Sequence, residues 1–548
     1  MAQPIASPGP GDTRDHPTAP GDRRWMILAV VGVAQLMVVL DSTIVNIALP
    51  SAQHALGFAN SDRQWVVTAY ALAFGSLLLV GGRLGDMYSR RWVLIIGLIG
   101  FAVASAIGGA AVSFVMLVVA RALQGAFGAI LAPAALGTLV STFQDPRERN
   151  RAFAVFGSVA VGGGAVGLIL GGILTQYLSW RYTLFVNLIF AAVAVVGALA
   201  YIRSSRPANP PRMDWPGAVL ACAGLFLIVF GFSHAETASW TAPLTLGSLI
   251  LGGVLLTAFV VAERRSSHPL LPLRVILDRT RGGSYVAVGI TGIALFGIFL
   301  FLTFYMQQVK GYSPLTTGLL FLPLVGGILV ASTLYSVLPQ VGPRPLVTAG
   351  MLLGAGGTAY LAQLTVTSSY VGVVLPALII MGLGFGLIFA SGVNSATAGV
   401  PYEDSGVASA LVNTMQQVGG SIGISVLSTI TASVTASYLI AHHTGPQAPA
   451  VAATHGYTIA FAISAALLGL GAILAILMLP SRKRLAELTG EASALVPEPE
   501  PEGPPPALRP PHEASPAQHP AAKVMPVGLL CCSPVIDPGV APAAGPSL

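Results

Sequence analysis

The sequence has little charge and almost no cysteine. Only 9% of its 548 residues are Asp, Glu, Lys or Arg, against about 25% in ordinary soluble domains. Charged side chains are therefore too few to cover the water-exposed surface of a soluble protein of this length. The three cysteines, Cys222, Cys531 and Cys532, have neither a disulfide framework nor metal-ligand spacing. No Walker A pattern and no cluster of catalytic or metal-ligating side chains occurs in the sequence. We therefore expect no metal, no nucleotide-driven chemistry and no enzyme.

Apolar residues are abundant instead. They make up 54% of the chain, and the mean hydropathy is +0.77, which is typical of a surface that faces lipid. A helix that crosses a bilayer needs roughly 20 mostly apolar residues. Such runs occupy residues 25–49, 64–82, 92–110, 113–140, 151–175, 180–202, 215–234, 243–262, 283–306, 314–337, 343–363, 368–395, 405–436 and 456–479. The sequence therefore predicts an all-α integral membrane protein with fourteen transmembrane helices.

Positive charges alternate along this series of spans. Of the 27 Lys and Arg residues, 23 fall on one side of the predicted membrane, three (Arg63, Arg181 and Lys310) fall on the other, and Arg121 lies within a span. Loops rich in Lys and Arg face the cytoplasm, so we expect both termini to be cytoplasmic. The distribution of Lys and Arg thus predicts the orientation, and the net charge of +6 does not indicate a nucleic-acid partner.

The longest basic interval between spans, residues 263–282, divides the chain. Beyond residue 480 the composition changes to Pro, Ala and Glu, which cannot bury a core. The predicted order is a cytoplasmic segment 1–24, a six-helix bundle 25–202, two inserted helices 203–262, a cytoplasmic loop 263–282, a second six-helix bundle 283–479 and a disordered cytoplasmic tail 480–548.

Asp41 is the one acidic residue of 21 that lies well inside a predicted span. An ionised Asp near the bilayer centre costs at least about 2.5–3.5 kcal/mol on insertion scales, so it needs a partner or a role. Asp41 and Arg121 each lie eight residues from the outer end of their spans, which puts both about 12 Å below the surface. We expect Asp41 to be a proton-coupling site made switchable by Arg121. The alternative is a static ion pair that fixes helix packing.

Residues 82–91 predict a tight cytoplasmic turn between two spans. Its candidate gate residues are Gly82, Arg83, Asp86, Arg90 and Arg91. Asp86 can pair with Arg90 or meet a helix N-terminus elsewhere, which would form a breakable latch. The alternative is a turn whose charges only set the topology.

Glycines recur at intervals of four in the span 151–175. Gly163, Gly167 and Gly171, extended by Gly172, make one smooth helix face. Another helix can slide on such a face or simply pack closely against it.

Polar and aromatic side chains within the spans are candidates for lining a substrate cavity. An aromatic ring can stack on a hydrophobic cation, whereas the polar groups could instead hold helices together. The candidates are Tyr70, Gln124, Asn187, Gln307, Asn413 and Gln416.

Six motifs lie in order along the spans, at residues 40–50, 82–91, 121–125, 163–172, 180–187 and 313–323. Together they resemble the major facilitator superfamily, and specifically its fourteen-span branch of drug:proton antiporters, over about residues 25–480. The sequence departs from the branch at Leu168, where the antiporter motif has Pro, and at Ser89, where the loop motif has Gly. The missing proline removes a fixed kink.

The resemblance implies two six-helix bundles plus two inserted helices that work by rocker-switch alternating access around a site near mid-membrane. It implies that a single chain exports hydrophobic, in some cases cationic, drugs or antibiotics across the bacterial cytoplasmic membrane in exchange for protons. The proton gradient would supply the energy, and no cofactor is expected. The alternatives are a dedicated exporter of one endogenous metabolite (a peptide, a siderophore or a self-made antibiotic), an uptake permease, or a non-transporting membrane sensor.

Overall fold

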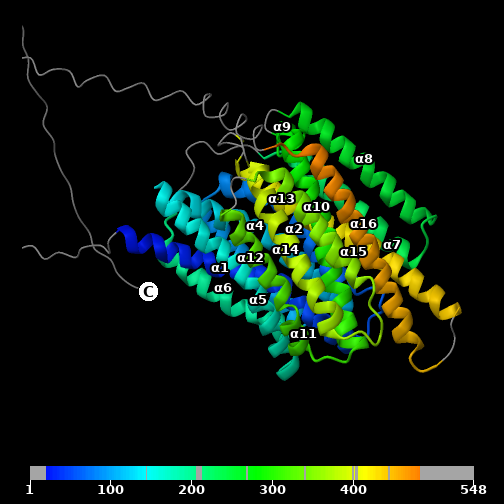
Figure 1. Ribbon diagram of the computed structural model, residues 1–548. Coiled ribbons are helices and arrows are strands. Elements are labelled where there is room, and N and C mark those ends of the chain that lie inside the picture. Colours follow the sequence, from blue (N-terminus) through cyan, green and yellow to red (C-terminus); the bar gives the residue numbers. More distant parts are fainter. Residues whose placement is uncertain are drawn as a thin grey trace, which may run out of the picture. The chain divides into compact units, whose positions relative to one another are not determined.

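The computed structural model describes residues 20–481 except 144, 205–212, 267–268, 338–340, 398–399, 401–404 and 442–444. Within these residues the regular secondary structure is helical (Figure 1). Residues 482–548 of the predicted tail and residues 1–19 of the predicted segment 1–24 lie outside the described residues.

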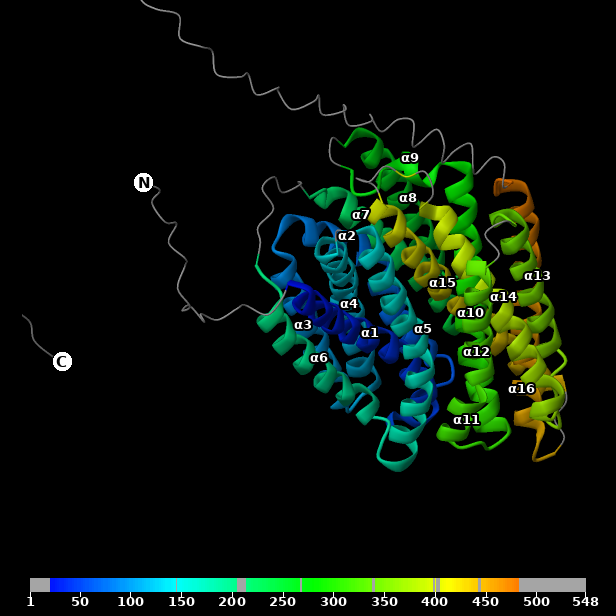
Figure 2. The same cartoon turned by 60° about the vertical axis from the view of Figure 1, so that its left-hand side comes forward.

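Six long helices form the first bundle and contact one another extensively, with α4 packed on α2 and α3, and α1 packed on α5 and α6. Their bounds are α1 (Pro20–Leu56), α2 (Gln64–Met87), α3 (Arg90–Gly109), α4 (Phe114–Thr142), α5 (Pro146–Tyr177) and α6 (Tyr182–Tyr201). The helices in Figure 2 that are drawn in blue to cyan belong to this bundle.

Short polar residues and prolines start several of these helices. Asp145 precedes α5, and its Oδ1 accepts hydrogen bonds from the backbone N–H groups of Arg147 and Glu148 at 2.9 and 3.0 Å. Pro146 then occupies the first helical position, where its missing N–H would have had no helical partner.

The inserted helices α7 (Trp215–Thr237) and α8 (Pro243–Arg265) pair with each other. One side of α7 packs against α2, and another packs against α15 of the second bundle. Ser233 Oγ lies 2.9 Å from Ser425 Oγ of α15, and Cys222 Sγ lies 3.4 Å from the carbonyl oxygen of Ser76 in α2. The inserted pair therefore touches both bundles through α7.

The second bundle begins after the single turn α9 (Leu273–Ile276). Two of its helices include a π-helical turn, and one span is divided at Phe321 into two helices. The bounds are α10 (Arg279–Phe304) with η1 (Tyr305–Val309), α11 (Pro314–Leu320), α12 (Leu322–Val337), α13 (Pro343–Leu361), η2 (Tyr370–Val374), α14 (Leu375–Thr397), α15 (Ser405–Ala441) and α16 (Ala448–Met478).

A helix occupies each of the fourteen predicted spans, and thirteen of them, within the described residues, are long and apolar enough to cross a membrane. The remaining one is α13, whose 19 residues begin Pro-Arg-Pro and contain several glycines. It packs against α14 and α16, and Arg344 and the glycines lower its mean hydropathy. The all-α membrane fold is confirmed.

Two details of the predicted spans are wrong. Helix α1 continues through Pro50 to Leu56, beyond the predicted end at residue 49; membrane helices tolerate an internal proline when neighbours satisfy the freed carbonyl. Helix α2 continues to Met87, so the predicted turn over residues 82–91 shrinks to Tyr88 and Ser89. Glycine and charge at 82–86 therefore end the apolar run without ending the helix.

The two bundles meet along several helix pairs. Helix α2 packs against α15, α5 packs against α11 and α12, and α1 touches α10 and α11. Some of these contacts are between main chains, since a Cβ added to Gly318 of α11 would lie 2.2 Å from the carbonyl oxygen of Leu168 in α5. Only glycine allows α5 and α11 to approach this closely.

Candidate functional site

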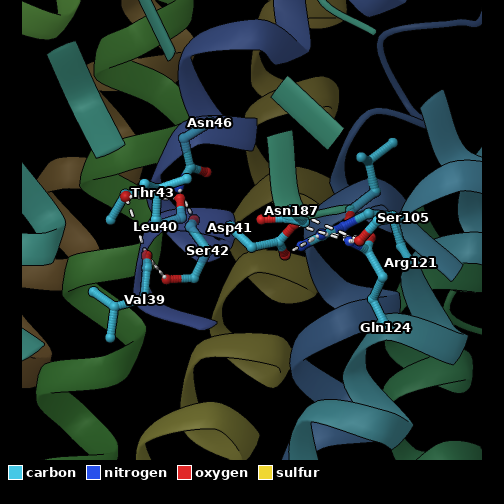
Figure 3. A network of polar contacts seen from close by, with 11 residues as sticks. Val39, Leu40, Asp41, Ser42, Thr43, Asn46, Ser105, Arg121, Gln124 and Asn187 are labelled. Carbon is cyan, nitrogen blue, oxygen red and sulfur yellow. Dashed lines mark hydrogen bonds and ion pairs between the residues drawn. The ribbon is translucent and has the colours of Figure 1, made fainter. Parts of the chain in front are cut away.

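Asp41 lies in α1 with no exposed surface. Its Oδ2 is 2.6 Å from Nη1 of Arg121, and its Oδ1 accepts hydrogen bonds from Gln124 Nε2 at 2.8 Å and Asn187 Nδ2 at 2.7 Å. Figure 3 shows these donors converging on the carboxylate from α4 and α6. A buried carboxylate is tolerated when it is both paired with a cation and hydrogen-bonded, and Asp41 meets both conditions.

Arg121 is held on several sides. Its Nε donates to the carbonyl oxygen of Val66 at 3.1 Å, and Nη1 also donates to Gln124 Oε1 at 2.9 Å. The guanidinium carbon lies 4.4 Å from the centre of the Tyr70 ring, a cation–π contact that gains strength away from water. The two charges that the sequence predicts at one depth are thus one ion pair, fixed in place by α2 and α4.

Ser105 of α3 completes the network. Its Oγ lies 2.7 Å from Gln124 Nε2 and 3.3 Å from Asn187 Nδ2, and the side chain is fully buried. The Oδ1 atom of Asn187 is buried and has no hydrogen-bond partner. The carboxylate of Asp41 therefore has an unused acceptor beside it.

A small cavity reaches Arg121 and has a volume of about 10 Å³, room for about one water molecule. Its walls are mostly apolar and come from α1, α2, α4 and α6. They are Val45, Ala48, Leu49, Ala52, Val66, Leu117, Arg121, Trp180, Thr183 and Leu184. Because Ala52, Trp180 and Leu117 lie towards the predicted outer ends of their helices, this gap extends from the ion pair in that direction.

The glycine face of α5 packs directly on the helix that bears Asp41. A Cβ added to Gly163 would lie 3.0 Å from Leu36, one on Gly167 would lie 2.0 Å from Thr43 Oγ1, and one on Gly171 would lie 2.8 Å from Ile44. These contacts cover α1 on both sides of Asp41 along the chain. The glycines therefore let α5 lie against the turns of α1 next to the ion pair.

Gly172 differs from the other three glycines. A Cβ there would lie 2.5 Å from the Cα atom of Leu315 and 3.0 Å from the carbonyl oxygen of Pro314. These atoms belong to α11, so Gly172 lies at a contact between the two bundles and not against α1.

The predicted gate residues occupy the end of α2 and the start of α3. Arg83 Nη2 donates to the carbonyl oxygen of Pro269 at 2.6 Å, so it is bonded to the segment between α8 and α9. The guanidinium of Arg91 lies 5.6 Å from the ring of Trp92, and Arg90 lies beside Gly137 of α4. The side chain of Asp86, on which the predicted latch depends, lies outside the described residues.

The six residues predicted to line a cavity lie in three different parts of the structure. Tyr70, Gln124 and Asn187 belong to the Asp41 network. Gln307 Nε2 donates to the carbonyl oxygen of Ile47 at 3.0 Å and so joins η1 to α1 across the bundles. Asn413 is exposed on α15 and Gln416 is half-buried there.

Sequence reasoning missed three buried polar residues. Ser105 gave no signal, because a serine in an apolar span usually bonds to its own helix. Glu263 falls at the start of the predicted cytoplasmic loop 263–282, yet it is 4% exposed and accepts hydrogen bonds from the backbone N–H groups of Leu270 and Leu271 at 3.2 and 3.0 Å. Arg63 is one of the three cations that the sequence places on the far side of the membrane, and it is only 6% exposed.

Residues 31–424 match the family model described as Major Facilitator Superfamily. The chain belongs to this superfamily. Superfamily members are membrane transporters, and the inserted helix pair, the paired bundles and the buried ion pair described above are features of this member.

Named relatives within the superfamily are close. The chain is 47% identical over 478 residues to the puromycin resistance protein pur8 of Streptomyces alboniger, covering 86% of this chain and 95% of the relative. It is 39% identical over 420 residues to the cephamycin export protein CmcT of Amycolatopsis lactamdurans, covering 74% and 85%. It is 34% identical over 413 residues to the tetracenomycin C resistance and export protein of Streptomyces glaucescens, covering 75% and 76%.

Solved structures agree on the superfamily fold at low identity. An auto-inhibited peptide transporter of the POT family aligns with a TM-score of 0.62 at 15% identity, covering 85% of this chain and 99% of that one. A bacterial homologue of the lysosomal transporter Spinster, inward-facing and unoccupied, aligns with a TM-score of 0.59 at 15% identity, covering 86% and 98%. At this identity the likeness concerns the fold alone.

Proposed function

We propose that this superfamily member exports a hydrophobic, antibiotic-like compound across the bacterial cytoplasmic membrane in exchange for protons. The observation that carries the proposal is the ion pair of Asp41 and Arg121, fully enclosed and yet next to a gap of one water. The relatives support the proposed class of transported compound, since they are named for resistance to, or export of, puromycin, cephamycin and tetracenomycin C.

The coupling step follows from the charge balance of the network. When Asp41 takes up a proton, Arg121 becomes a buried cation without a counter-charge, which costs several kcal/mol. The protonated carboxyl also needs an acceptor, and rotation of the Asn187 amide would supply its unused Oδ1. Protonation therefore favours a different arrangement of α1, α4 and α6, and deprotonation favours the present one.

The energy is sufficient for export. One proton moving through about 150 mV releases about 3.5 kcal/mol, which can sustain a several-hundredfold cargo gradient. One embedded acid per chain meets this need, so a single chain can be the functional unit without a cofactor.

The state described here corresponds in this proposal to a pump closed towards the outside. Both termini would be cytoplasmic, so that the ends of α1 and α5 near Leu56 and Tyr177 face outwards. Contacts between the bundles at these ends support the assignment: Gly172 on Leu315, Gly318 on Leu168, and Gln307 on the main chain of Ile47. Opening to the outside would have to separate them.

Everted membrane vesicles with an acidified lumen test the proposal. We expect cargo to release protons from the lumen in vesicles that carry the wild-type protein, and Asp41→Asn to abolish this release, because Asn cannot bind a proton at physiological pH. Ser42→Ala is the matched control, since Ser42 neighbours Asp41 and its hydroxyl donates to the carbonyl oxygen of Val39 in its own helix. Full proton-coupled transport by Asp41→Asn would show that the coupling site lies elsewhere.

A narrower cargo is the second candidate, because the relatives quoted above are each named for one compound. A susceptibility panel in a host without its own pumps separates the two. Protection against one antibiotic class would support a dedicated exporter, and protection against several unrelated classes would support a multidrug pump.

A further inference from the structure

Arg63 immediately precedes α2 in the first bundle, but its side chain is buried in the second. The guanidinium carbon lies 4.1 Å from the centre of the Phe304 ring, 5.6 Å from that of Tyr457 and 6.0 Å from that of Phe301. Phe301 and Phe304 belong to α10 and Tyr457 belongs to α16. We call these three rings the aromatic box.

The rings, and not a counter-ion, hold this charge. Within the described part of the chain Arg63 forms no salt bridge, its buried Nε has no hydrogen-bond partner, and Nη1 makes one long bond of 3.4 Å to the Tyr457 hydroxyl. Burying a guanidinium without a carboxylate is costly, and aromatic faces offset that cost by cation–π attraction. The aromatic box is therefore a cation receptor built by the second bundle alone.

A cavity of about 220 Å³ adjoins the aromatic box. Arg63 and Tyr457 form part of its wall, the exposed residues Asn60 and Ala436 lie on it as well, and so do the buried hydroxyls of Ser428 and Thr431. The cavity thus leads from the exposed residues Asn60 and Ala436, at the predicted outer end of the molecule, to the aromatic box that Arg63 occupies.

We propose that the aromatic box is an organic-cation site with two alternative occupants. Arg63 fills it while the bundles are closed at this end, and the ammonium group of a cationic cargo fills it after Arg63 has withdrawn. Withdrawal needs no local unfolding, because Arg63 and the rings belong to different bundles and any separation of the bundles at this end draws them apart. The identity of the natural ligand as cargo rests on the proposed export function; the existence of the site does not.

The returning arginine would also promote release. A tethered guanidinium competes with any bound cation for the same three rings, at a high effective concentration. Re-closure at this end would then displace the ligand towards the cavity of Asn60 and Ala436, in one direction only.

Binding of choline to the purified protein in a maltoside detergent tests the proposal without transport or a proton gradient. Arg63→Ala and Arg63→Gln vacate the box, and we expect each to bind choline roughly five- to thirtyfold more tightly than wild type, the range that a cation–π site supplies. Arg63→Lys retains a tethered cation and should gain much less. Equilibrium dialysis with labelled choline gives the affinities, and thermal unfolding checks that each variant is folded.

Two controls make the result specific. The neutral isostere 3,3-dimethylbutan-1-ol should gain nothing, and Phe304→Leu added to Arg63→Gln should remove the gain for choline. Arg181→Ala should leave the affinity unchanged, because Arg181 stacks on Trp180 at 4.7 Å and bonds to Gly109 and Ala111 inside its own bundle.

Unchanged choline affinity in folded Arg63→Gln, or an equal gain for the neutral alcohol, would overturn the cation site and leave Arg63 as a static contact between bundles. Proton-coupled export could still hold in that case. Conversely, a gain in choline binding would stand even if Asp41→Asn vesicles retained full coupling.

Discussion

The buried polar side chains of the two bundles differ in their hydrogen-bond partners. In the first bundle Asp41, Arg121, Gln124, Asn187 and Ser105 bond to one another from four different helices. In the second bundle the buried polar side chains among the described residues are Ser, Thr and Tyr, and none of its own side chains that are buried there is an amide or a charged group. Many of these return their hydroxyl to a carbonyl four residues earlier, such as those of Thr291, Thr358, Ser395 and Ser464.

This difference separates a bundle whose helices share buried charges from one whose buried hydroxyls bond mostly to their own helix or to single groups of a neighbouring one. A hydroxyl bonded to its own helix moves with that helix and opposes no rearrangement. A shared ion pair has to be rebuilt whenever its helices move. In the coupling proposed above, a change of protonation would therefore alter helix packing in the first bundle.

Among the substitutions that test this difference between the bundles, removing Arg121 should have the largest effect on stability. Arg121→Leu leaves the Asp41 carboxylate buried without a counter-charge, and we expect a loss of about 3–5 kcal/mol in the free energy of unfolding. Unfolding in detergent micelles measures it. Adding Asp41→Asn should recover a large part of that loss, because the uncompensated charge is removed as well. A double variant as unstable as Arg121→Leu would mean that the unpaired carboxylate is not the cause of the loss.

Removing one amide of the network should have a smaller effect. Gln124→Met keeps the length of the side chain but deprives Asp41, Arg121 and Ser105 of a partner, and we expect a loss of about 1–3 kcal/mol. Gln416→Met on α15 is the counterpart in the second bundle and should stay within about 0.5 kcal/mol of wild type. Equal losses in the two variants would contradict the contrast between the bundles.

The smallest effect is expected where a hydroxyl serves only its own helix. Thr291→Val removes the 2.8 Å bond to the carbonyl oxygen of Ala287 and should cost less than about 1 kcal/mol, with transport retained. Ser105→Ala sharpens the test, since that serine bonds to side chains of two other helices. We expect its loss of stability to exceed that of Thr291→Val, and the reverse order would count against our interpretation.

Much of this architecture follows from sequence. Hydropathy predicts the spans because a bilayer requires roughly 20 apolar residues of every helix that crosses it. Counting residues from the predicted span ends brings Asp41 and Arg121 to one depth. The glycine interval of four predicts a smooth face, and that face meets another helix. Depth and face are properties of single helices, which sequence encodes directly.

Properties that need several helices at once were not predictable. Nothing local marks Ser105 as a partner of Gln124 and Asn187, because their helices meet only in the folded bundle. Arg63 has the sequence surroundings of a solvated loop charge, and its aromatic partners lie more than 230 positions away. Helix α2 also passes through the glycines at 82 and 85, since packing on α4 outweighs their poor helix propensity.

The contact between the glycines of α5 and the turns of α1 around Asp41 has a mechanical consequence. Gly163, Gly167 and Gly171 touch α1 from Leu36 to Ile44, so a displacement of α5 along or away from α1 changes the main chain next to the embedded carboxylate. A movement of α5 can therefore change the surroundings of the Asp41 carboxylate without any contact between Asp41 and the transported compound. In a transporter built this way, substitutions among the residues that contact the compound can change which compound is carried and leave the Asp41–Arg121 pair and the α1–α5 contact unchanged.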